Sequence, residues 1–172
     1  GDSLPADEAL LTDPALHISD QEPWSFGEKY TDWAKKAIEL RYCLLPCLYT
    51  AMWLHTLDGT PVIRHLLFAD AGDPKLWEQE RDFLFGEHIL VSPVIQQKVQ
   101  RQAVYLPKGN WYYFWTGQPG NGEIFVNVMP EQVPFFIREG AVLPVYPTRQ
   151  HTGETIEELT LYVYYKNGQE TS

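Results

Sequence analysis

Hydrophobic residues recur at helical spacing in the first third of the chain. The repeating positions are Trp33, Ala37, Leu40 and Leu44. Residues three and four apart lie on the same face of an α-helix, so this run predicts an amphipathic helix. Ser25 and Glu28 stand before it with the spacing of a capping box, in which serine and glutamate satisfy backbone amides reciprocally. We therefore expect the helix to begin at Ser25.

A proline interrupts this helical region. Pro46 has no amide hydrogen to donate to the preceding turn, so the helix should kink or restart near Leu45. A second helical piece then extends to about His55, and Asp58-Gly59 indicates a turn.

Three short hydrophobic segments follow the helices. Residues 61–68 and 88–95 are typical of short buried strands. Residues 74–85 can form a helix, with Pro74 near its first position, where a missing amide donor costs nothing. The first half of the chain is thus expected to be largely helical.

The pattern changes after about residue 87. Strand-like segments follow one another between turns that contain glycine, and Ile124, Val126 and Val128 recur at the period of two that is typical of a strand. The expected strands are about 99–106, 111–116, 123–128, 134–138, 141–146 and 159–165. Short strands with frequent turns favour an antiparallel β-sandwich. The sequence therefore predicts an α+β chain, helical up to about residue 87 and β-structured after it.

Aromatic residues occupy all five positions from 111 to 115. Side chains alternate between the two faces of a strand. Trp111, Tyr113 and Trp115 should therefore share one face, and Tyr112 and Phe114 the other. One interpretation is that one face fills the sandwich core and the other packs against a neighbouring layer. The alternative is an exposed platform on which a sugar ring stacks.

Composition and charge narrow the possible partners. The 172 residues are 44% hydrophobic, which is sufficient for a packed core. The formal net charge of −10 disfavours binding to polyanions, so we expect no nucleic-acid partner. The longest uncharged hydrophobic run, residues 42–54, contains a proline and is too short to cross a bilayer. No membrane partner is expected.

The two cysteines, Cys43 and Cys47, lie on one face of the predicted helix. We interpret them as small buried side chains. A metal site would need two further ligands nearby, and no suitably spaced His or Cys pair supplies them. The sequence thus indicates neither a disulfide framework nor a metal centre.

Six segments in order carry a resemblance to a known family. They are 21-QEPWSFGE-28, 41-RYCLLPCLYT-50, 59-GTPVIRHLLF-68, 82-DFLFGEHILVSPV-94, 105-YLPKGNWYYFWTG-117 and 134-PFFIREGAVLP-144. In this order and spacing they resemble glycoside hydrolase family 31, the α-glucosidases, α-xylosidases and their relatives, over roughly residues 20–147.

The resemblance implies a fold and a division into domains. Family members have a (β/α)8 barrel followed by proximal and distal β-sandwiches. Residues 1–87 would then be the C-terminal portion of the catalytic barrel, and 88–158 the proximal antiparallel β-sandwich. Residues 159–172 would be the start of a further β-domain or the last strand of the sandwich.

The resemblance also implies where the catalytic groups lie. The family's two catalytic aspartates belong to motifs upstream of anything present in this sequence, so no catalytic residue is expected here. A retaining mechanism requires two carboxyl groups about 5–5.5 Å apart, and no acidic pair of this chain matches those motifs. The candidate pairs are Asp13 with Asp20, Asp70 with Asp73, and Glu157 with Glu158. We interpret all of them as loop residues that cap turns or face water.

One substrate contact of the family has a candidate in this chain. In relatives a histidine in a Phe-Phe-Arg-x-His-type motif precedes the Glu-Pro-Trp motif and contacts the sugar at the cleavage site. Here His17 precedes 22-EPW-24, at a shorter spacing and without the Phe-Phe-Arg part. The resemblance makes His17 a candidate substrate-binding residue, and an ordinary loop histidine is the alternative.

The expected function follows from the family. The chain would be the C-terminal segment of a retaining α-glycosidase, in the first place an α-glucosidase, that hydrolyses terminal non-reducing α-linked sugars. The segment would brace the barrel, would be inactive alone and would require no cofactor. Its partners would be an α-linked oligosaccharide or glucoside and the remainder of the barrel, and an exposed hydrophobic face would favour self-association. The alternative is a non-catalytic carbohydrate-binding or assembly β-module.

Overall fold

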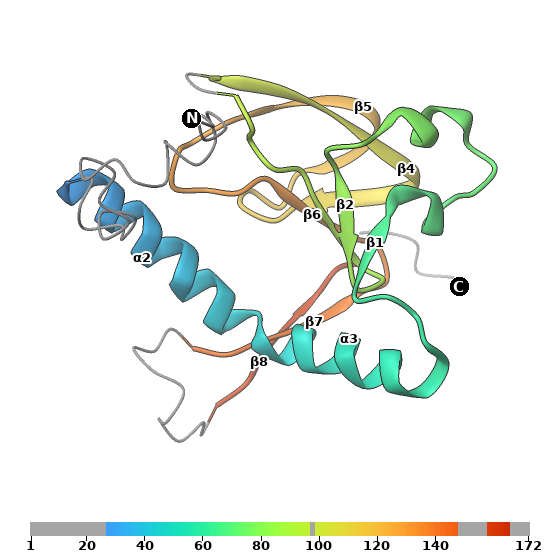
Figure 1. The fold of residues 1–172 in the computed structure, drawn as a ribbon, viewed down its shortest axis with the longest axis horizontal. Helices are drawn as coiled ribbons and strands as arrows, with labels where there is room; N and C mark the ends of the chain where they lie inside the picture. Colours follow the sequence, from blue (N-terminus) through green and yellow to red (C-terminus); the bar gives the residue numbers. More distant parts are fainter. Residues whose placement is uncertain (1–26, 97–98, 148–157, 166–172) are drawn as a thin grey trace, which may run out of the picture.

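The computed structural model describes residues 27–96, 99–147 and 158–165. Within these ranges, two consecutive helices lie beside a six-stranded antiparallel sheet, and a two-stranded antiparallel sheet lies below it (Figure 1). The helices are α2 (Glu28–Cys43) and α3 (Leu45–Asp58), with two short 3-10 helices, η3 (Leu66–Phe68) and η4 (Pro74–Glu78). The strands are β1 (Ile63–His65), β2 (Phe83–Phe85), β3 (Ile89–Val91), β4 (Arg101–Tyr113), β5 (Pro119–Asn127), β6 (Phe135–Arg138), β7 (Val142–Val145) and β8 (Thr160–Val163).

Helix α2 begins after Gly27 and not at Ser25. Gly27 is the N-cap residue, with φ 98° and ψ 165°, a backbone conformation that glycine adopts far more readily than other residues. No described side chain caps this end, and the amides of Tyr30 and Thr31 donate to the Gly27 carbonyl, each at 3.1 Å. The capping-box prediction is therefore wrong, because the chain enters the helix through a glycine and not through a serine.

The break between the two helices is confirmed. Helix α2 ends at Cys43 and α3 begins at Leu45, with Leu44 between them at φ −89° and ψ 4°. Pro46 lies in the first turn of α3, where its missing amide leaves no hydrogen bond unmade. Helix α3 ends at Asp58, and Gly59 caps it: its left-handed backbone (φ 76°) lets its amide donate to the His55 carbonyl at 2.9 Å.

The larger sheet has the strand order β1-β2-β3-β6-β4-β5, and every neighbouring pair is antiparallel. Two local predictions are wrong. Residues 74–85 form no α-helix: only η4 is helical, and residues 83–85 form β2. Strand β1 covers only Ile63–His65 of the predicted 61–68, because the chain turns into η3 directly after it. The physical reason is that β2 pairs on both sides, with β1 and β3, so sheet hydrogen bonds replace the helical ones.

Strand β4 joins two segments that the pattern separates. Its residues 101–106 pair with β5, and the pairing resumes after an irregularity between Leu106 and Trp111. Trp111, Tyr112 and Tyr113 also pair with β6 on the other side. The predicted strands 99–106 and 111–116 are therefore one long strand, and this strand ends at Tyr113.

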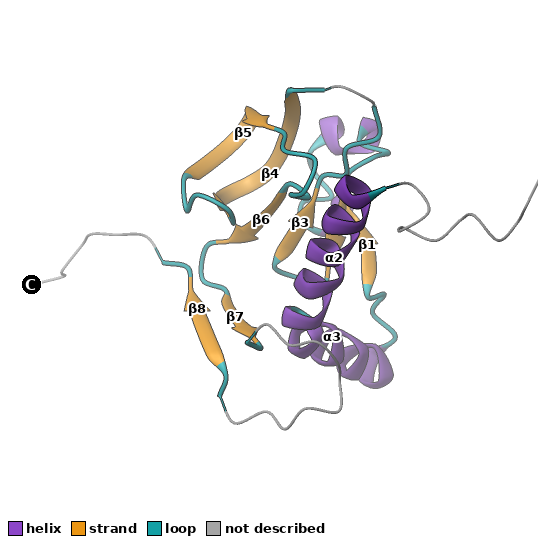
Figure 2. Ribbon diagram, turned by 90° about the vertical axis from the view of Figure 1, so that its left-hand side faces the viewer, coloured by secondary structure: helices purple, strands orange, loops and turns teal. Residues whose placement is uncertain are grey.

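The middle of the larger sheet, at β3 and β6, is buried on both faces. Residues of η3 and η4 cover one face, and the β7–β8 sheet covers the other together with the junction of α2 and α3 (Figure 2). The first core consists of Leu66, Leu76, Leu84, Leu90, Val104, Leu106, Trp111, Val126 and Phe136. The second core consists of Ile89, Phe135, Ile137, Ala141 and Leu143, with Leu40, Leu44 and Cys47 packed against it.

The described chain is thus a mixed helix and sheet structure with antiparallel sheets, as the α+β pattern predicts. The boundary expected at residue 87 falls inside one hydrogen-bonded sheet, because β1 and β2 precede it and β3 follows it. Among the described residues, no helix has the length and hydrophobicity needed to cross a membrane.

Candidate functional site

The predicted substrate contact, His17, belongs to residues 1–26, which lie outside the described residues. Asp13, Asp20 and Glu157 also lie outside the described residues. The assignment of His17 therefore stays a prediction. The site described below is built from the rest of the chain.

Two of the candidate acids have structural roles in a loop, as expected. Asp70 accepts a hydrogen bond from the amide of Gly72 at 3.1 Å. Asp73 accepts one from the amide of Lys75 at 3.0 Å and one from the Tyr105 hydroxyl at 2.7 Å. The hydrogen bond to the Asp73 carboxylate raises the pKa of the Tyr105 hydroxyl. These contacts cap η4 and tie it to β4.

A third acid, Asp82, is buried in a polar cluster within the sheet. Its carboxylate accepts hydrogen bonds from Arg81 at 2.7 and 3.3 Å and from the Ser92 hydroxyl at 2.8 Å. The Gln102 amide donates to the Ser92 hydroxyl oxygen at 2.7 Å and to the Ser92 carbonyl at 3.1 Å. Every member of the cluster therefore has a partner inside the protein, which is the arrangement of a structural group rather than of a reacting one.

The aromatic run does not form the exposed platform. Trp111 is fully buried in the first core, and its indole N–H donates to the Pro107 carbonyl at 2.9 Å. Because β4 ends at Tyr113, strand alternation does not extend to the next two residues. Phe114 and Trp115 lie in a turn and pack against the second core. A sugar platform made of Trp111 and Trp115 is therefore ruled out, and burial is the correct interpretation for Trp111.

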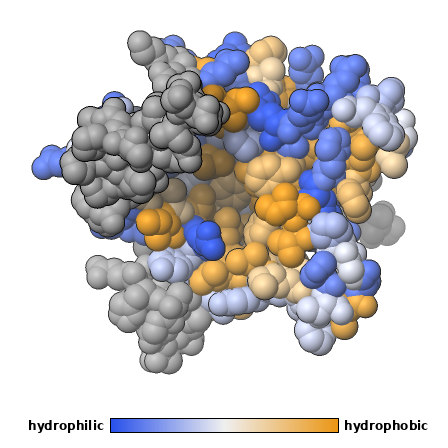
Figure 3. All heavy atoms as spheres, in the orientation of Figure 1, coloured by the Kyte–Doolittle hydropathy of each residue, from blue (hydrophilic) through white to orange (hydrophobic). Residues whose placement is uncertain are grey.

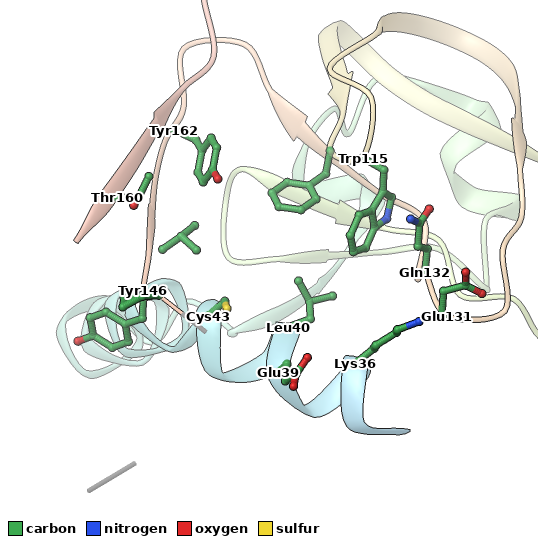
Figure 4. A pocket seen from close by; sticks show the side chains of 13 residues that line it. Lys36, Glu39, Leu40, Cys43, Trp115, Glu131, Gln132, Tyr146, Thr160 and Tyr162 are labelled. Carbon is green, nitrogen blue, oxygen red and sulfur yellow. The ribbon is translucent and has the colours of Figure 1, made fainter. Parts of the chain in front are cut away.

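A cleft of about 540 Å³ lies between α2, the turn after β4 and the β7–β8 sheet (Figure 4). It is the candidate site of the described chain because it combines aromatic and hydrogen-bonding side chains. The aromatic side chains are Phe114, Trp115, Tyr146 and Tyr162. The charged or amide side chains are Lys36, Glu39, Glu131 and Gln132.

The aromatic wall of the cleft is held in place by specific contacts. The Trp115 indole N–H donates to the Val133 carbonyl at 2.9 Å. Phe114 stacks on Phe135 with ring centroids 4.2 Å apart and meets Trp115 edge-on at 5.2 Å. On the other side of Phe114, Tyr162 of β8 lies edge-on to it, with ring centroids 6.3 Å apart. The rings thus form a fixed surface and not a set of independent side chains.

The polar end of the cleft carries charges of both signs. Lys36 points toward Glu131 in Figure 4, and its ammonium forms an ion pair with Asp32 at 2.9 Å. The hydrogen bond to Asp32 raises the pKa of Lys36, and the charges of Asp32, Glu131 and Glu39 act in the same direction. The cleft therefore offers a stable cation next to carboxylates that accept hydrogen bonds.

The described residues provide neither a metal-binding group nor a reactive cysteine. No group of three or more His, Cys, Asp or Glu side chains within the described ranges is arranged to hold a metal ion. Cys43 and Cys47 form no disulfide, and both are half-buried. The Cys47 thiol donates to the Pro144 carbonyl at 3.3 Å, and burial raises its pKa to about 11, so it stays protonated at neutral pH.

The sequence patterns do not single out Lys36, Glu131 or Gln132. Lys36 faces the cleft from α2, whereas Glu131 and Gln132 belong to the segment between β5 and β6. Only the packing of α2 beside the sheet brings them together. Trp115 did stand out in the sequence, as the last residue of the aromatic run 111–115.

Two sequence models of one family match the chain in order. The model described as the glycosyl hydrolases family 31 TIM-barrel domain matches residues 14–51. The model described as the glycosyl hydrolase family 31 C-terminal domain matches residues 59–143. The two matches fall on α2 with part of α3, and on β1 through β7.

Curated proteins from different organisms are similar over most of the chain. Alpha-glucosidase 2 of Bacillus thermoamyloliquefaciens is 35% identical over 90% of this chain and 20% of its own length. The alpha-xylosidase of Saccharolobus solfataricus is 36% identical over 88% of this chain and 21% of its own length. The chain therefore spans about a fifth of the length of these curated relatives.

Solved structures contain the same arrangement of elements. A Flavobacterium johnsoniae GH31 dextranase, determined as a mutant in complex with isomaltotriose, is similar with a TM-score of 0.80 and 31% identity over 85% of this chain and 18% of its own. The GH31 alpha-xylosidase of Xanthomonas citri is similar with a TM-score of 0.77 and 28% identity over 84% of this chain and 16% of its own.

Proposed function

The chain belongs to glycoside hydrolase family 31, and we propose that it is the C-terminal segment of a retaining α-glycosidase, in the first place an α-glucosidase. The observation that carries this proposal is the order of the two family matches, barrel domain first and C-terminal domain second. Relatives named as an alpha-glucosidase and an alpha-xylosidase support the same class of reaction. The substrates would be terminal non-reducing α-linked sugars.

Retaining hydrolysis needs two carboxyl groups on opposite sides of the scissile bond. One attacks the anomeric carbon and forms a covalent glycosyl intermediate, while the other protonates the leaving oxygen and then activates water. Asp70, Asp73 and Asp82 are engaged in turns or in the buried cluster. We therefore place both catalytic carboxyls outside the described residues, in barrel motifs that precede this sequence in relatives.

This chain would then support the reaction rather than perform it. Helices α2 and α3 would complete the end of the barrel, and the two sheets would brace it from outside. The contacts of Leu40 and Leu44 with the second core support this role, because they fix the helices on the sheet. His17 would be the one substrate contact that this chain contributes.

Hydrolysis of a fluorogenic α-glucoside and α-xyloside tests the proposal. The isolated chain, with its intact mass confirmed near 19.9 kDa, should show no turnover above background. Measurable turnover by this preparation would overturn the proposal, and Asp13, His17 and Asp20 would then be the first residues to substitute.

A second arm of the experiment uses the longest reading frame that contains this sequence. That protein should hydrolyse the substrate, and His17→Ala should lower its kcat/KM by about tenfold, the effect of one lost hydrogen bond to the substrate. His88→Ala is the matched control, because His88 is an exposed histidine beside the sheet. Equal effects of the two substitutions would remove His17 from the site.

A further inference from the structure

We propose that the cleft between α2 and the β7–β8 sheet, lined by Trp115, Lys36 and Glu131, binds a neutral oligosaccharide. The inference does not rest on the proposed hydrolytic role, because it concerns binding by described residues only. Of the expected platform it keeps Trp115, and it replaces the buried Trp111 with Phe114 and Tyr162.

The size of the cleft suits a short sugar chain. Its volume of about 540 Å³ lies within the range of pockets that hold small organic ligands, roughly 300–1,000 Å³. The cleft is open to solvent and not an enclosed cavity. A linear oligosaccharide could therefore place one or two units inside and leave the rest in solvent.

The aromatic wall matches the less polar face of a pyranose ring. Sugar C–H groups pack well against aromatic faces because the ring quadrupole is negative above and below the plane. Trp115 is one ring of this wall, beside Phe114, and its N–H is already bonded to the Val133 carbonyl. Its orientation is therefore set before any ligand arrives, which lowers the entropic cost of binding.

The polar side chains match the hydroxyl groups of a sugar. Each hydroxyl can both donate and accept, so it needs acceptors and donors close together. Glu39 and Glu131 supply carboxylate acceptors, and Lys36 supplies an ammonium donor. A purely hydrophobic ligand would displace water from these partly exposed charged groups without replacing its hydrogen bonds, which is costly.

The charge balance selects against anionic ligands. The chain has a formal net charge of −10, so an anionic ligand would be repelled over distance. The Lys36 ammonium stands beside Glu39 and Glu131, so the cleft itself offers charges of both signs. The hydroxyl groups of a neutral ligand can bond to both.

Isothermal titration of the 172-residue chain with isomaltotriose and maltotriose tests the proposal. We expect saturable binding of at least one trisaccharide. Trp115→Ala should weaken it at least about tenfold, and Glu131→Gln should weaken it severalfold because an uncharged acceptor makes a weaker hydrogen bond. Trp77→Ala is the matched control, because Trp77 is an exposed tryptophan outside the cleft, and its binding should be unchanged.

Circular dichroism and thermal unfolding of each variant show whether it is folded. If Trp115→Ala fails to fold, Glu131→Gln and Lys36→Gln decide the question, since both residues have partly exposed side chains. Absence of binding in the unsubstituted chain overturns the proposal, as does binding that no cleft substitution weakens. A lack of hydrolysis bears only on the catalytic proposal, so the two can fail separately.

Discussion

Asp82 is the acid most completely enclosed by the described structure, with 2% of its surface exposed. Its carboxylate is paired with Arg81, whose side chain is 30% exposed, and with the buried Ser92 hydroxyl. Such a network stabilises the sheet only when all of its members are satisfied, because an unpaired charge in a low-dielectric interior is expensive. Removal of one member should therefore leave the others with unsatisfied polar groups and destabilise the sheet.

Asp82→Ala should lower the free energy of unfolding by about 3 kcal/mol, since it removes the charge partner of the Arg81 guanidinium and leaves the buried Ser92 hydroxyl without its acceptor. Urea denaturation followed by circular dichroism measures the change. Glu80→Ala is the control, because Glu80 is an exposed acid of the same loop and should change the free energy by less than about 0.5 kcal/mol. Equal losses for the two substitutions would contradict a structural role for the cluster.

The aromatic run 111–115 shows which single side chains can be placed correctly from the sequence. Alternation correctly places Trp111 and Tyr113 on one core. It fails at Trp115, because the rule holds only while the strand continues, and the strand ends at Tyr113. The end of a strand is set by its pairing partners, here β6 and β5, which lie elsewhere in the sequence.

At the scale of elements, the junction of α2 and α3 is the feature that sequence defines best. Pro46 stands in the first turn of α3, where no amide donor is needed. Thr50 reinforces this turn, because its hydroxyl donates to the Pro46 carbonyl at 2.8 Å. Helix α2 cannot continue through a proline, so a new helix starts at this point. Helix α3 tolerates Pro46 because its first turn needs no amide donor there.

Pro46→Ala should therefore change the free energy of unfolding by less than about 1 kcal/mol, because the proline already occupies a favourable position. Ala51→Pro is the contrasting variant: it places proline in the interior of the same helix, at a buried position, and should cost at least about 3 kcal/mol. Thermal unfolding of both variants measures the difference. If Pro46→Ala lowers the free energy of unfolding as much as Ala51→Pro does, Pro46 contributes more to stability than its favourable position at the start of α3 explains.

The bounds of a strand could be predicted to within a few residues where the hydrophobic pattern of the segment alone indicates a strand. The segments expected at 123–128, 134–138, 141–146 and 159–165 correspond to β5, β6, β7 and β8. Residues 74–85 were not predictable, because a short hydrophobic run such as Phe83, Leu84 and Phe85 fits a buried helical segment as well as a buried strand. Their pairing with β1 and β3 decides the outcome, and no local pattern carries that information.

For the whole molecule, the candidate cleft was beyond the reach of sequence patterns. Its walls come from α2, the turn after β4, the segment before β6, and β8. These segments lie side by side only because α2 packs against the second core through Leu40 and Leu44. Family resemblance did not supply the cleft either, since the quoted motifs concern elements of the fold and not the space between them.

The two helices leave a hydrophobic surface uncovered, as the sequence predicts for this chain. Helix α2 has no fully buried side chain, and α3 buries only Leu45 and Ala51. Hydrophobic side chains gather in the centre of the face shown in Figure 3. One stripe of α3 is exposed at helical spacing. It consists of Tyr49, Met52, Trp53 and Leu57. Exposed hydrophobic stripes of this kind mark surfaces that pack against another element or another chain.

The isolated chain should consequently self-associate through α3. Sedimentation velocity over a range of concentrations should show a rising average mass, and Trp53→Lys should shift the transition to at least about tenfold higher concentration, because a charge would have to be desolvated in the contact. Trp77→Lys is the matched control: Trp77 is 66% exposed against 62% for Trp53, but it lies on η4 and not on α3. Lysine is a good helix former, so loss of association in the Trp53 variant cannot be attributed to loss of the helix if circular dichroism is unchanged. A chain that stays monomeric at all concentrations, or equal shifts for both variants, would show that the stripe of α3 is not an association surface.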